Sequence, residues 1–499
     1  MNSTLTTAYV LLKSAWQAVF LRSAFIAFLL APLAALHAAD APKPKPNILF
    51  ILTEDQGAHL SCLGTAGLQT PHMDALAKTG TLFRNAFVAY PVCSPSKASI
   101  YTGLHNHRSG ILNNTVNYHV TASKLTPAQR QNPLYLRNRI AADIPTLTER
   151  LRDLGYHQAV THKLHVAPVE KFPYDEFLPN PDGQVMQRFL QRAAAKAKPW
   201  FLLYNIPNTH RPYPNSDKVK IRVQPSVVKL PAFLPDTPVV RQDWAEYLAG
   251  IEQADALVGQ AMDTLRASGQ LDRTIIVFLG DHGPTFQHGK MTPYDLGLRT
   301  PLIIAGPGIQ AGRTDALASE LDLMPTLLDL AGAEVPRGLH GISLRGVLEG
   351  RANPPRHDFI VAEISHRGNL PNDGMQERAI FDARWKLIYR EKTDPPWRQV
   401  NADSKQWPTW GNRTYAETVR VKEQFPEAFR VLAGLDPQNL GGNVPALELY
   451  DLQSDPDELH DLASRSEHAA QRDRLYAALR QWVRDTADTA VNPPATAQR

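Results

Sequence analysis

Cysteine and dense positive charge are both scarce in this chain. Only Cys62 and Cys93 occur among its 499 residues, so at most one disulfide can form. The formal net charge of +4 is small for this length, and no basic block is dense enough to indicate nucleic-acid binding. A local basic pocket for an acidic saccharide stays compatible with that charge. Internal repeats are absent, and low complexity is confined to the Pro/Lys stretch at residues 41–46.

Apolar runs long enough to span a membrane are also lacking. Lys13 and Arg22 precede an apolar run at residues 23–36, which is too short for a spanning helix and is followed by small residues suited to cleavage. We therefore expect a signal peptide at residues 1–39, a linker at 40–46, and export to the periplasm or the extracellular space without stable membrane association. An uncleaved anchor is the alternative, because a weaker apolar segment at residues 8–20 lies upstream.

The rest of the chain has the composition of a globular protein with ample core. Apolar residues make up 43% and charged residues 20%, and the 40 prolines favour long ordered loops around a regular scaffold. Continuous apolar runs suit strands that are buried on both faces of a sheet. Four such runs lie at residues 47–52, 200–205, 274–279 and 301–304.

Helical patterns separate these runs. Residues 244–265 repeat apolar side chains at helical spacing, and residues 143–147 open another helix with Pro145 near its first turn. Alternating strands and helices predict an α/β sandwich with a large, mostly parallel sheet flanked by helices. We assign it to residues 47–354 and expect the catalytic site there.

The pattern changes from about residue 355. Short β-like pieces occur at residues 359–364, 385–389 and 448–452, and a final helix is expected at about 466–486. These elements predict a small C-terminal α+β subdomain at residues 355–490.

Acidic side chains follow two of the predicted strands directly. Glu54 and Asp55 come after the first strand, and Asp281 and His282 come after a later one. Ligands often bind where the strands of such a sheet end, and these side chains would line a cage of mainly oxygen donors. Calcium or magnesium fits such a cage best, while the imidazole leaves zinc or manganese open. Taken singly, each pair also suits a helix cap or a solvated surface.

Basic and histidine side chains also gather after strands. Lys163 and His165 are two residues apart, so both would leave the same face of an extended segment. His210 follows the run at 200–205, and Lys290 follows Asp281 by a short loop. Such donors would stabilise the negative charge that develops when an anionic group is transferred. Each of them alone is equally typical of a surface charge or a core histidine.

The sequence from Cys93 to Gly103 is the most specific motif. It reads Cys-Ser-Pro-Ser-Lys-Ala-Ser-Ile-Tyr-Thr-Gly and resembles the Cys-x-Pro-Ser-Arg and Thr-Gly signature of the formylglycine-dependent (type I) sulfatases of the alkaline phosphatase superfamily. Lys97 replaces the arginine of that signature. In this family the cysteine is oxidised to formylglycine, whose hydrate attacks sulfur. An ordinary buried thiol at a helix start is the alternative for Cys93.

The resemblance extends from residue 46 to the Asp-Pro-Asp-Glu phrase at 455–458, and it implies an alkaline-phosphatase-like sandwich. It implies one metal ion, usually calcium, held by Glu54, Asp55, Asp281, His282 and the modified Cys93. Glu54 departs from the commoner aspartate and His282 from the commoner asparagine, but both can ligate. We interpret Cys62 as a buried thiol, because pairing it with Cys93 would remove the nucleophile.

The resemblance also implies catalytic roles. Modified Cys93 would be the nucleophile, Lys97 would hold the hydrate, and His165, beside Lys163, would be the base for the elimination step. His210 and Lys290 would bind the sulfate oxygens and assist the leaving group. A formylglycine-generating maturation enzyme is an implied partner. Lys97 lies in the sequence that this enzyme reads, so it affects the conversion of Cys93. It also lacks the planar fork of arginine, which affects how the hydrate is positioned.

The substrate is less determined than the reaction. The phrases at residues 84–87, 102–107 and 199–204 resemble the heparan N-sulfatase branch and its bacterial relatives, which implies a sulfated saccharide carrying N-sulfate or O-sulfate. The aromatic and proline-rich stretches at 211–238 and 397–410 suit either cleft walls or ordered loops. Two other functions stay open: a phosphoester or phosphonate hydrolase of the same superfamily, and an exported glycan-binding protein with an unmodified Cys93.

Overall fold

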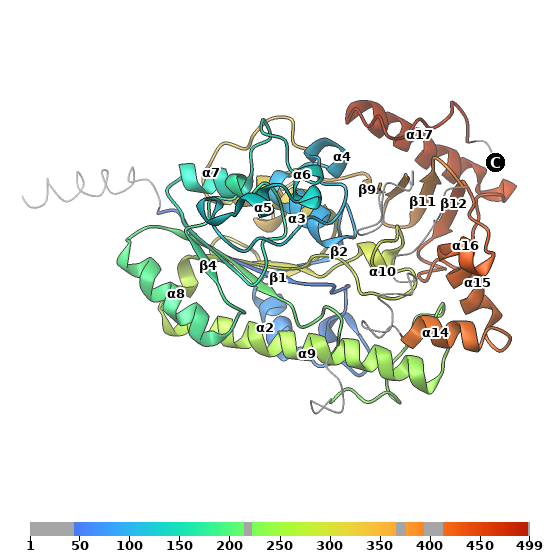
Figure 1. Ribbon diagram of the computed structural model, residues 1–499, viewed down its shortest axis with the longest axis horizontal. Helices are drawn as coiled ribbons and strands as arrows, with labels where there is room; N and C mark the ends of the chain where they lie inside the picture. Colours follow the sequence, from blue (N-terminus) through green and yellow to red (C-terminus); the bar gives the residue numbers. More distant parts are fainter. Residues whose placement is uncertain (1–43, 214–221, 366–375, 394–412, 498–499) are drawn as a thin grey trace, which may run out of the picture. The chain divides into compact units, whose positions relative to one another are not determined.

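The computed structural model describes residues 44–213, 222–365, 376–393 and 413–497 (Figure 1). Within these ranges, residues Pro46–Arg499 belong to one compact unit. The expected signal peptide, the first part of the linker and the stretch at 397–410 lie outside the described residues. No helix in the described ranges combines the length and apolar character that crossing a membrane requires.

An eight-stranded sheet forms the centre of this unit, with the strand order β4-β3-β5-β1-β6-β7-β2-β8. Only β7 runs antiparallel to its neighbours, so the sheet is mixed and mostly parallel, as the sequence predicts. The four apolar runs form β1, β5, β6 and β7. The strands are β1 Asn47–Thr53, β2 Thr81–Phe87, β3 His157–Thr161, β4 Glu176–Leu178, β5 Trp200–Ile206, β6 Thr274–Gly280, β7 Leu302–Ala305 and β8 Gly312–Ser319.

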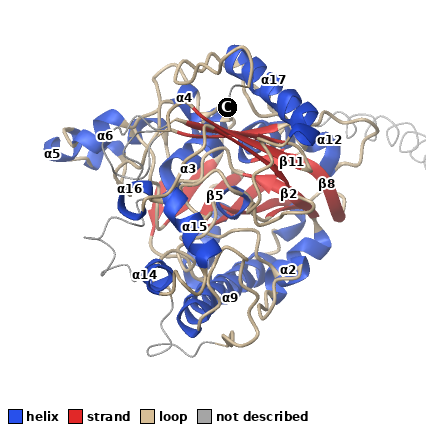
Figure 2. Ribbon diagram, turned by 90° about the vertical axis from the view of Figure 1, so that its right-hand side faces the viewer, coloured by secondary structure: helices blue, strands red, loops and turns tan. Residues whose placement is uncertain are grey.

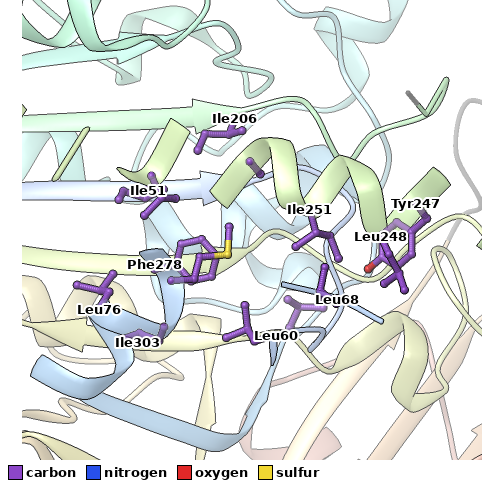
Figure 3. Packing of buried hydrophobic residues seen from close by; sticks show 14 of the residues in the cluster. Ile51, Leu60, Leu68, Leu76, Ile206, Tyr247, Leu248, Ile251, Phe278 and Ile303 are labelled. Carbon is purple, nitrogen blue, oxygen red and sulfur yellow. The ribbon is translucent and has the colours of Figure 1, made fainter. Parts of the chain in front are cut away.

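Both faces of this sheet are buried, which explains why its central strands are apolar throughout. Successive side chains of β1 point to opposite faces: Leu49 and Ile51 belong to one core, and Ile48, Phe50 and Leu52 to the other. Figure 3 shows the first core, which contains Ile51 and Phe278 of the sheet together with Leu248 and Ile251 of the long helix α9.

Helices cover the two faces (Figure 1). Helices α2, α8 and α9 pack on one side, and α3, α7 and α11 on the other. The bounds are α2 Pro71–Thr79, α3 Cys93–Thr102, α4 Asn106–Ser109, α5 Pro127–Arg130, α6 Pro133–Arg137, α7 Leu147–Asp153, α8 Gly183–Ala195, α9 Pro238–Ala267, α10 Asp295–Leu298, α11 Leu323–Leu330, α12 Arg345–Leu348, α14 Arg413–Arg420, α15 Pro426–Leu435, α16 Pro437–Leu440 and α17 Ala469–Asp485. Short 3-10 turns are η1 Ser61–Leu63, η2 Ala122–Lys124, η3 Val169–Lys171, η4 Leu271–Arg273, η5 Glu320–Asp322 and η7 Ser466–His468.

Two of the predicted helices differ in where they begin. Helix α9 starts at Pro238, six residues before the expected boundary, because Thr237 caps it and proline suits the first helical position. Helix α7 starts at Leu147, at the end of the expected segment, so Pro145 lies near its first turn, as predicted, but before the helix itself. Thr146 is the N-cap, and it forms a capping box with Glu149.

A second, antiparallel sheet of four strands has the order β12-β11-β10-β9 (Figure 2). Its strands are β9 Ile360–Ile364, β10 Glu377–Phe381, β11 Trp385–Arg390 and β12 Leu447–Asp451. One face packs on α17, and the other joins the core of the large sheet, where the rings of Phe381 and Phe87 are 4.7 Å apart. The division into domains at residues 354 and 355 stays a prediction.

The described part of the stretch at 211–238 is an ordered loop packed on the core. Tyr213, Val223, Val228 and Phe233 are buried in the same cluster as α9. This favours the loop interpretation of these residues over a cleft wall.

Candidate functional site

The predicted site residues meet at the carboxyl edge of the large sheet. Strands β3, β5, β1 and β6 are neighbours and run parallel, so the segments that follow them share one edge. Helix α3 begins there with Cys93, shortly after β2. The residues that follow the four strands are Lys163 and His165 after β3, His210 after β5, Glu54 and Asp55 after β1, and Asp281, His282 and Lys290 after β6.

Cys93 is buried at the first position of α3. Its Sγ lies 3.4 Å from Lys290 Nζ, 3.4 Å from His282 Nε2 and 4.0 Å from Asp55 Oδ1. Burial raises the pKa of this thiol, but the charges of Lys163, Lys290 and His282 together lower it well below its ordinary value. The residue is therefore in the surroundings of a reactive cysteine rather than those of an inert core thiol.

Three buried carboxylates face three lysines. Lys97 Nζ lies 2.7 Å from both Glu54 Oε1 and Asp281 Oδ2, and Lys163 Nζ lies 2.6 Å from Glu54 Oε2. Lys290 Nζ lies 2.9 Å from Asp55 Oδ1. Each carboxylate thus has a cationic partner, which is the condition under which buried charges are tolerated.

Three histidines surround Cys93, and each makes a ring hydrogen bond to a backbone carbonyl. His165 Nε2 donates to the Thr115 carbonyl at 2.8 Å, His210 Nδ1 to the Arg211 carbonyl at 2.6 Å, and His282 Nδ1 to the Gly283 carbonyl at 2.9 Å. A carbonyl oxygen only accepts hydrogen bonds, so these contacts place the proton on the named nitrogen. In a neutral ring the other nitrogen then carries the lone pair, which can accept a proton or bind a cation.

The segment that carries Lys163 and His165 is not extended, and that expectation is wrong. His162 and His165 have φ values of 57° and 51°, in the left-handed region, and the Lys163 N–H donates to the Thr161 carbonyl at 2.6 Å. The chain therefore turns directly after β3. Both side chains still reach the site, because the turn and not strand alternation directs them there.

A loop on the other side of the site holds this turn. Asn117 Oδ1 accepts the N–H groups of Leu164 and His165, both at 3.1 Å. The same loop contacts helix α3, since the Ser94 N–H donates to Asn114 Oδ1 at 3.1 Å. The loop thereby links His165 to the start of α3.

Several donors and acceptors can hold a metal ion. Groups of ligand atoms within 4.8 Å of one another are formed by Glu54, Asp55 and Asp281, and by Cys93, Asp281 and His282. His282 Nε2 is 3.5 Å from Asp55 Oδ1 and 3.7 Å from Asp281 Oδ1. Carboxylate oxygens with one imidazole nitrogen are a donor set that fits a divalent cation. Gly283 is required beside them, because a Cβ there would lie 1.6 Å from the Leu296 carbonyl oxygen.

Two polar residues that the sequence analysis does not single out belong to the site. Asn205 Nδ2 donates to Glu54 Oε1 at 3.0 Å, and Thr285 Oγ1 donates to Asp55 Oδ2 at 3.1 Å. Asn205 has a detectable signal, because it is the one amide in the otherwise apolar run of β5. Thr285 lies in a loop and carries no such signal.

Cys62 is half-buried rather than buried, so that expectation is corrected. Both cysteines are free thiols in this structure. Burial, followed by the neighbouring Asp74, raises the pKa of Cys62 to about 11. The two cysteines therefore have opposite electrostatic surroundings.

The chain belongs to the sulfatase family, whose model, described as Sulfatase, matches residues 46–333, more than half of the sequence. A second model, described as N-sulphoglucosamine sulphohydrolase, C-terminal, matches residues 280–421. Membership in this family is what the signature at Cys93 predicts, and it identifies the protein as a hydrolase of the sulfatase class.

Two relatives agree with this class, and one structural neighbour shares the fold. Human N-sulphoglucosamine sulphohydrolase is 27% identical over 498 residues, which cover 90% of this chain and 92% of that protein. An ulvan-active sulfatase of Formosa agariphila is 27% identical over 496 residues, which cover 90% and 76%. A phosphonate monoester hydrolase from Silicibacter pomeroyi has a TM-score of 0.65 at 20% identity, covering 89% of this chain and 96% of that one, and shows the shared fold.

Proposed function

We propose that this protein hydrolyses sulfate esters or sulfamates of sulfated carbohydrates, with a formylglycine made from Cys93 as its nucleophile. The observation that carries the proposal is the position of Cys93. Its side chain starts a helix at the carboxyl edge of the sheet, within 3.4 Å of both Lys290 and His282. Its sulfur also lies within 4.8 Å of possible ligand atoms of Asp55, His210 and Asp281.

A divalent cation, with calcium the expected ion, would be held by Glu54, Asp55, Asp281 and His282 together with the modified Cys93. When bound, it would supply positive charge beside the sulfate oxygens and the nucleophile. Lys163 and Lys290 supply such charge from this chain. Lys290 is buried and Lys163 is partly buried, and both lower the pKa of the group at position 93.

His165 is suited to take up a proton during the elimination of sulfate. Its Nε2 donates to the Thr115 carbonyl, so Nδ1 carries the lone pair. Among the described residues, no group makes a hydrogen bond of normal geometry to this Nδ1. Burial and then Lys163 lower the pKa of His165 to about 4. The ring is therefore neutral at pH 7, which is the state that a general base requires.

His210 is suited to the leaving group. It lies with Asp55 and Cys93 in one group of possible ligand atoms, and its Nδ1 is fixed by the Arg211 carbonyl. Arg211 is itself held by Asp243 through contacts of 2.9 and 2.8 Å, which fixes the loop. Through its other nitrogen, His210 would donate a proton to the leaving group, which is the sugar oxygen or nitrogen whose bond to sulfur breaks.

The names of the relatives support a saccharide substrate. One relative is an ulvan-active sulfatase and another an N-sulphoglucosamine sulphohydrolase, each covering most of this chain. We therefore infer a sulfated saccharide, with N-sulfate and O-sulfate as the two alternatives. Maturation by a formylglycine-generating enzyme and export to the periplasm or the extracellular space complete the proposal.

The test is turnover by protein coexpressed with a maturation enzyme. We expect hydrolysis of nitrophenyl sulfate to exceed that of nitrophenyl phosphate and phosphonate esters, and release of sulfate from N-sulfated or O-sulfated glucosamine. Turnover of phosphorus substrates alone would contradict the proposal and support a phosphoester or phosphonate hydrolase. Binding of sulfated sugars without turnover by fully converted protein would support a glycan-binding protein.

A further inference from the structure

Glu320 is a buried acid that takes no part in the reaction proposed above. It opens the turn η5 directly after β8, and 1% of its surface is exposed. Within the described ranges no lysine, arginine or histidine forms an ion pair with it, in contrast to Glu54, Asp55 and Asp281. A buried carboxylate without a cation is costly, so its protonation state needs an explanation.

Both oxygens of Glu320 contact the segment that carries Cys93. Oε1 accepts the N–H of Ala89 at 2.9 Å, and the N–H of Tyr90 also donates to this carboxyl group, in the connection between β2 and α3. Oε2 lies 2.7 Å from the Oγ of Ser96, which is in the first turn of α3. Oε1 faces an N–H group, which can only donate, whereas Oε2 faces a hydroxyl group, which can also accept, so a proton on this carboxyl group is assigned to Oε2.

The two hydrogen bonds of Ser96 show that Glu320 carries this proton. Ser96 Oγ lies 2.7 Å from Glu320 Oε2 and also 2.6 Å from the Asp281 carbonyl oxygen. A hydroxyl group has one proton to donate, and the carbonyl oxygen can only accept. If Glu320 were ionised, one of these two short contacts would join two oxygens with no proton between them. Both contacts are satisfied when Glu320 donates to Ser96 and Ser96 donates to Asp281.

We propose that Glu320 is held as a neutral carboxylic acid, and that its proton completes a hydrogen-bond chain from Glu320 through Ser96 to the Asp281 carbonyl. In this chain Glu320 is a positioning residue for the nucleophile segment. Only its catalytic consequence rests on the proposed function, since the proton itself is a property of the folded protein.

The surroundings of Glu320 agree with a neutral acid. Burial raises its pKa well above the ordinary value, and the neighbouring Asp281 raises it further, while the hydrogen bonds of Ser96 and Ala89 only partly offset these effects. A charge on Glu320 would be a fourth carboxylate beside the three that Lys97, Lys163 and Lys290 already balance.

The chain connects three parts of the site. Ser96 holds the carbonyl of Asp281, and the adjacent Lys97 holds the carboxylate of the same residue at 2.7 Å. Helix α3 is thus attached twice to the residue that follows β6. Glu320 attaches the same helix to the end of β8 and fixes the distance between Cys93 and Asp281.

Infrared difference spectroscopy tests the proton directly, with or without turnover. The probe is the carbonyl stretch of a protonated carboxyl group, which lies at higher frequency than the carboxylate bands. We expect wild type minus Glu320→Gln to show one such band at pH 7. If the difference shows loss of carboxylate bands instead, Glu320 is ionised and the proposal is wrong.

Substitutions test the positioning role on protein whose conversion at Cys93 has been quantified. The amide of Glu320→Gln can accept from Ala89 and donate to Ser96, so we expect its kcat within about twofold of wild type, while Glu320→Ala loses on the order of tenfold or more. Glu363→Gln is the matched control, because Glu363 is equally buried but is ionised and paired with His107 at 2.7 Å.

The two glutamine variants should therefore differ in thermal stability. Glu363→Gln should lower the Tm, and Glu320→Gln should leave it unchanged. A Glu320→Gln variant as inactive as Glu320→Ala, or as unstable as Glu363→Gln, would overturn the proposal. If the wild type shows no turnover, the proposed function fails, while the infrared difference still decides the state of Glu320.

Discussion

The Lys97 ammonium lies 2.7 Å from the Asp281 carboxylate, and neither side chain has any exposed surface. The same ammonium lies 2.7 Å from Glu54, so one lysine joins the acid after β1 to the acid after β6. Lysine thus makes two charge-assisted contacts here, although the signature of the family has arginine at this position. Its role in the fold is that of a bridge between two strand ends.

Removing this bridge should destabilise the protein strongly. Lys97→Met would leave Glu54 with one cation fewer and Asp281 without its lysine, and breaking a buried ion pair in this way costs about 3–5 kcal/mol. Urea unfolding measures this free energy. A loss below about 1 kcal/mol, the value typical of a surface pair, would contradict the arrangement.

The conservative change Lys97→Arg separates stability from maturation. Arginine keeps the charge but needs more room in a fully buried position, and overpacking costs about 1–3 kcal/mol. We expect conversion of Cys93 to be unchanged or higher, because arginine restores the family signature. Mass spectrometry measures the converted fraction and urea unfolding the stability. A fall in the converted fraction would contradict this expectation.

The two cysteines should differ completely in their effect on activity. Cys93→Ala should abolish hydrolysis and keep the fold, because it removes the proposed nucleophile and only a small buried volume. Cys62→Ala, the control, should keep activity, since Cys62 is half-buried and lies outside the site. Steady-state kinetics with nitrophenyl sulfate and circular dichroism compare them. Full activity in Cys93→Ala would refute the nucleophile.

Metal content and activity should be lost together in Asp281→Ala. Asp281 belongs to two of the possible ligand groups, so its removal should lower bound metal after dialysis to a small fraction of the wild-type value. Asp322→Ala serves as the control, because Asp322 is also fully buried but binds His357 outside the site. Elemental analysis of both variants measures the difference, and equal metal content in the two would exclude Asp281 as a ligand.

Activity should persist in acid until His165 is protonated. Its pKa is lowered to about 4, so the neutral base form is present above that pH and is lost as pH falls through it. The acid limb of kcat should therefore lie near pH 4. A limb near pH 6.5, the ordinary value of histidine, would show that His165 is not the base.

The buried pair of His107 and Glu363 should give a window of maximal stability. Burial raises the pKa of Glu363, but His107 and Arg378 lower it well below 4.5, so its contribution is present above pH 4.5 and is lost as pH falls. Burial lowers the pKa of His107, but Glu363 raises it above 6.5 overall, so its contribution is full below pH 6.5 and is lost as pH rises. Between these values both are present.

Urea unfolding as a function of pH measures this window. The free energy lost in His107→Asn should be largest near pH 5.5 and smaller near pH 9, because the wild-type histidine loses its charge as pH rises through its raised pKa. An equal loss at both values would mean that the charge of His107 makes no contribution.

Sequence patterns were sufficient for β1, β5, β6 and β7, whose buried residues are almost all apolar. The central strands of the large sheet are buried on both faces, so their apolar runs are long and continuous. Strand β10 escaped prediction because it begins with Glu377 and Arg378, which are buried only through partners far along the chain. Glu377 pairs with Arg390 and Arg378 with Asp488, both at 2.7 Å.

The candidate site was predictable as a set of residues but not as a geometry. Its members follow strands, so topology brings them together once the sheet is known. The left-handed backbone at His165 and the acceptor role of Asn117 depend on contacts between distant loops. Glu320 has no local signal at all, because its role depends on how Ser96 distributes a single proton.

Mass spectrometry of the tryptic peptide at residues 85–97 tests the central claim most directly. The protein should come from its own host or be coexpressed with a maturation enzyme, and we predict an aldehyde or its hydrate in place of the Cys93 thiol. That result would establish the chemistry on which the proposed sulfatase mechanism depends. An intact thiol in a preparation that still hydrolyses sulfate esters would contradict it.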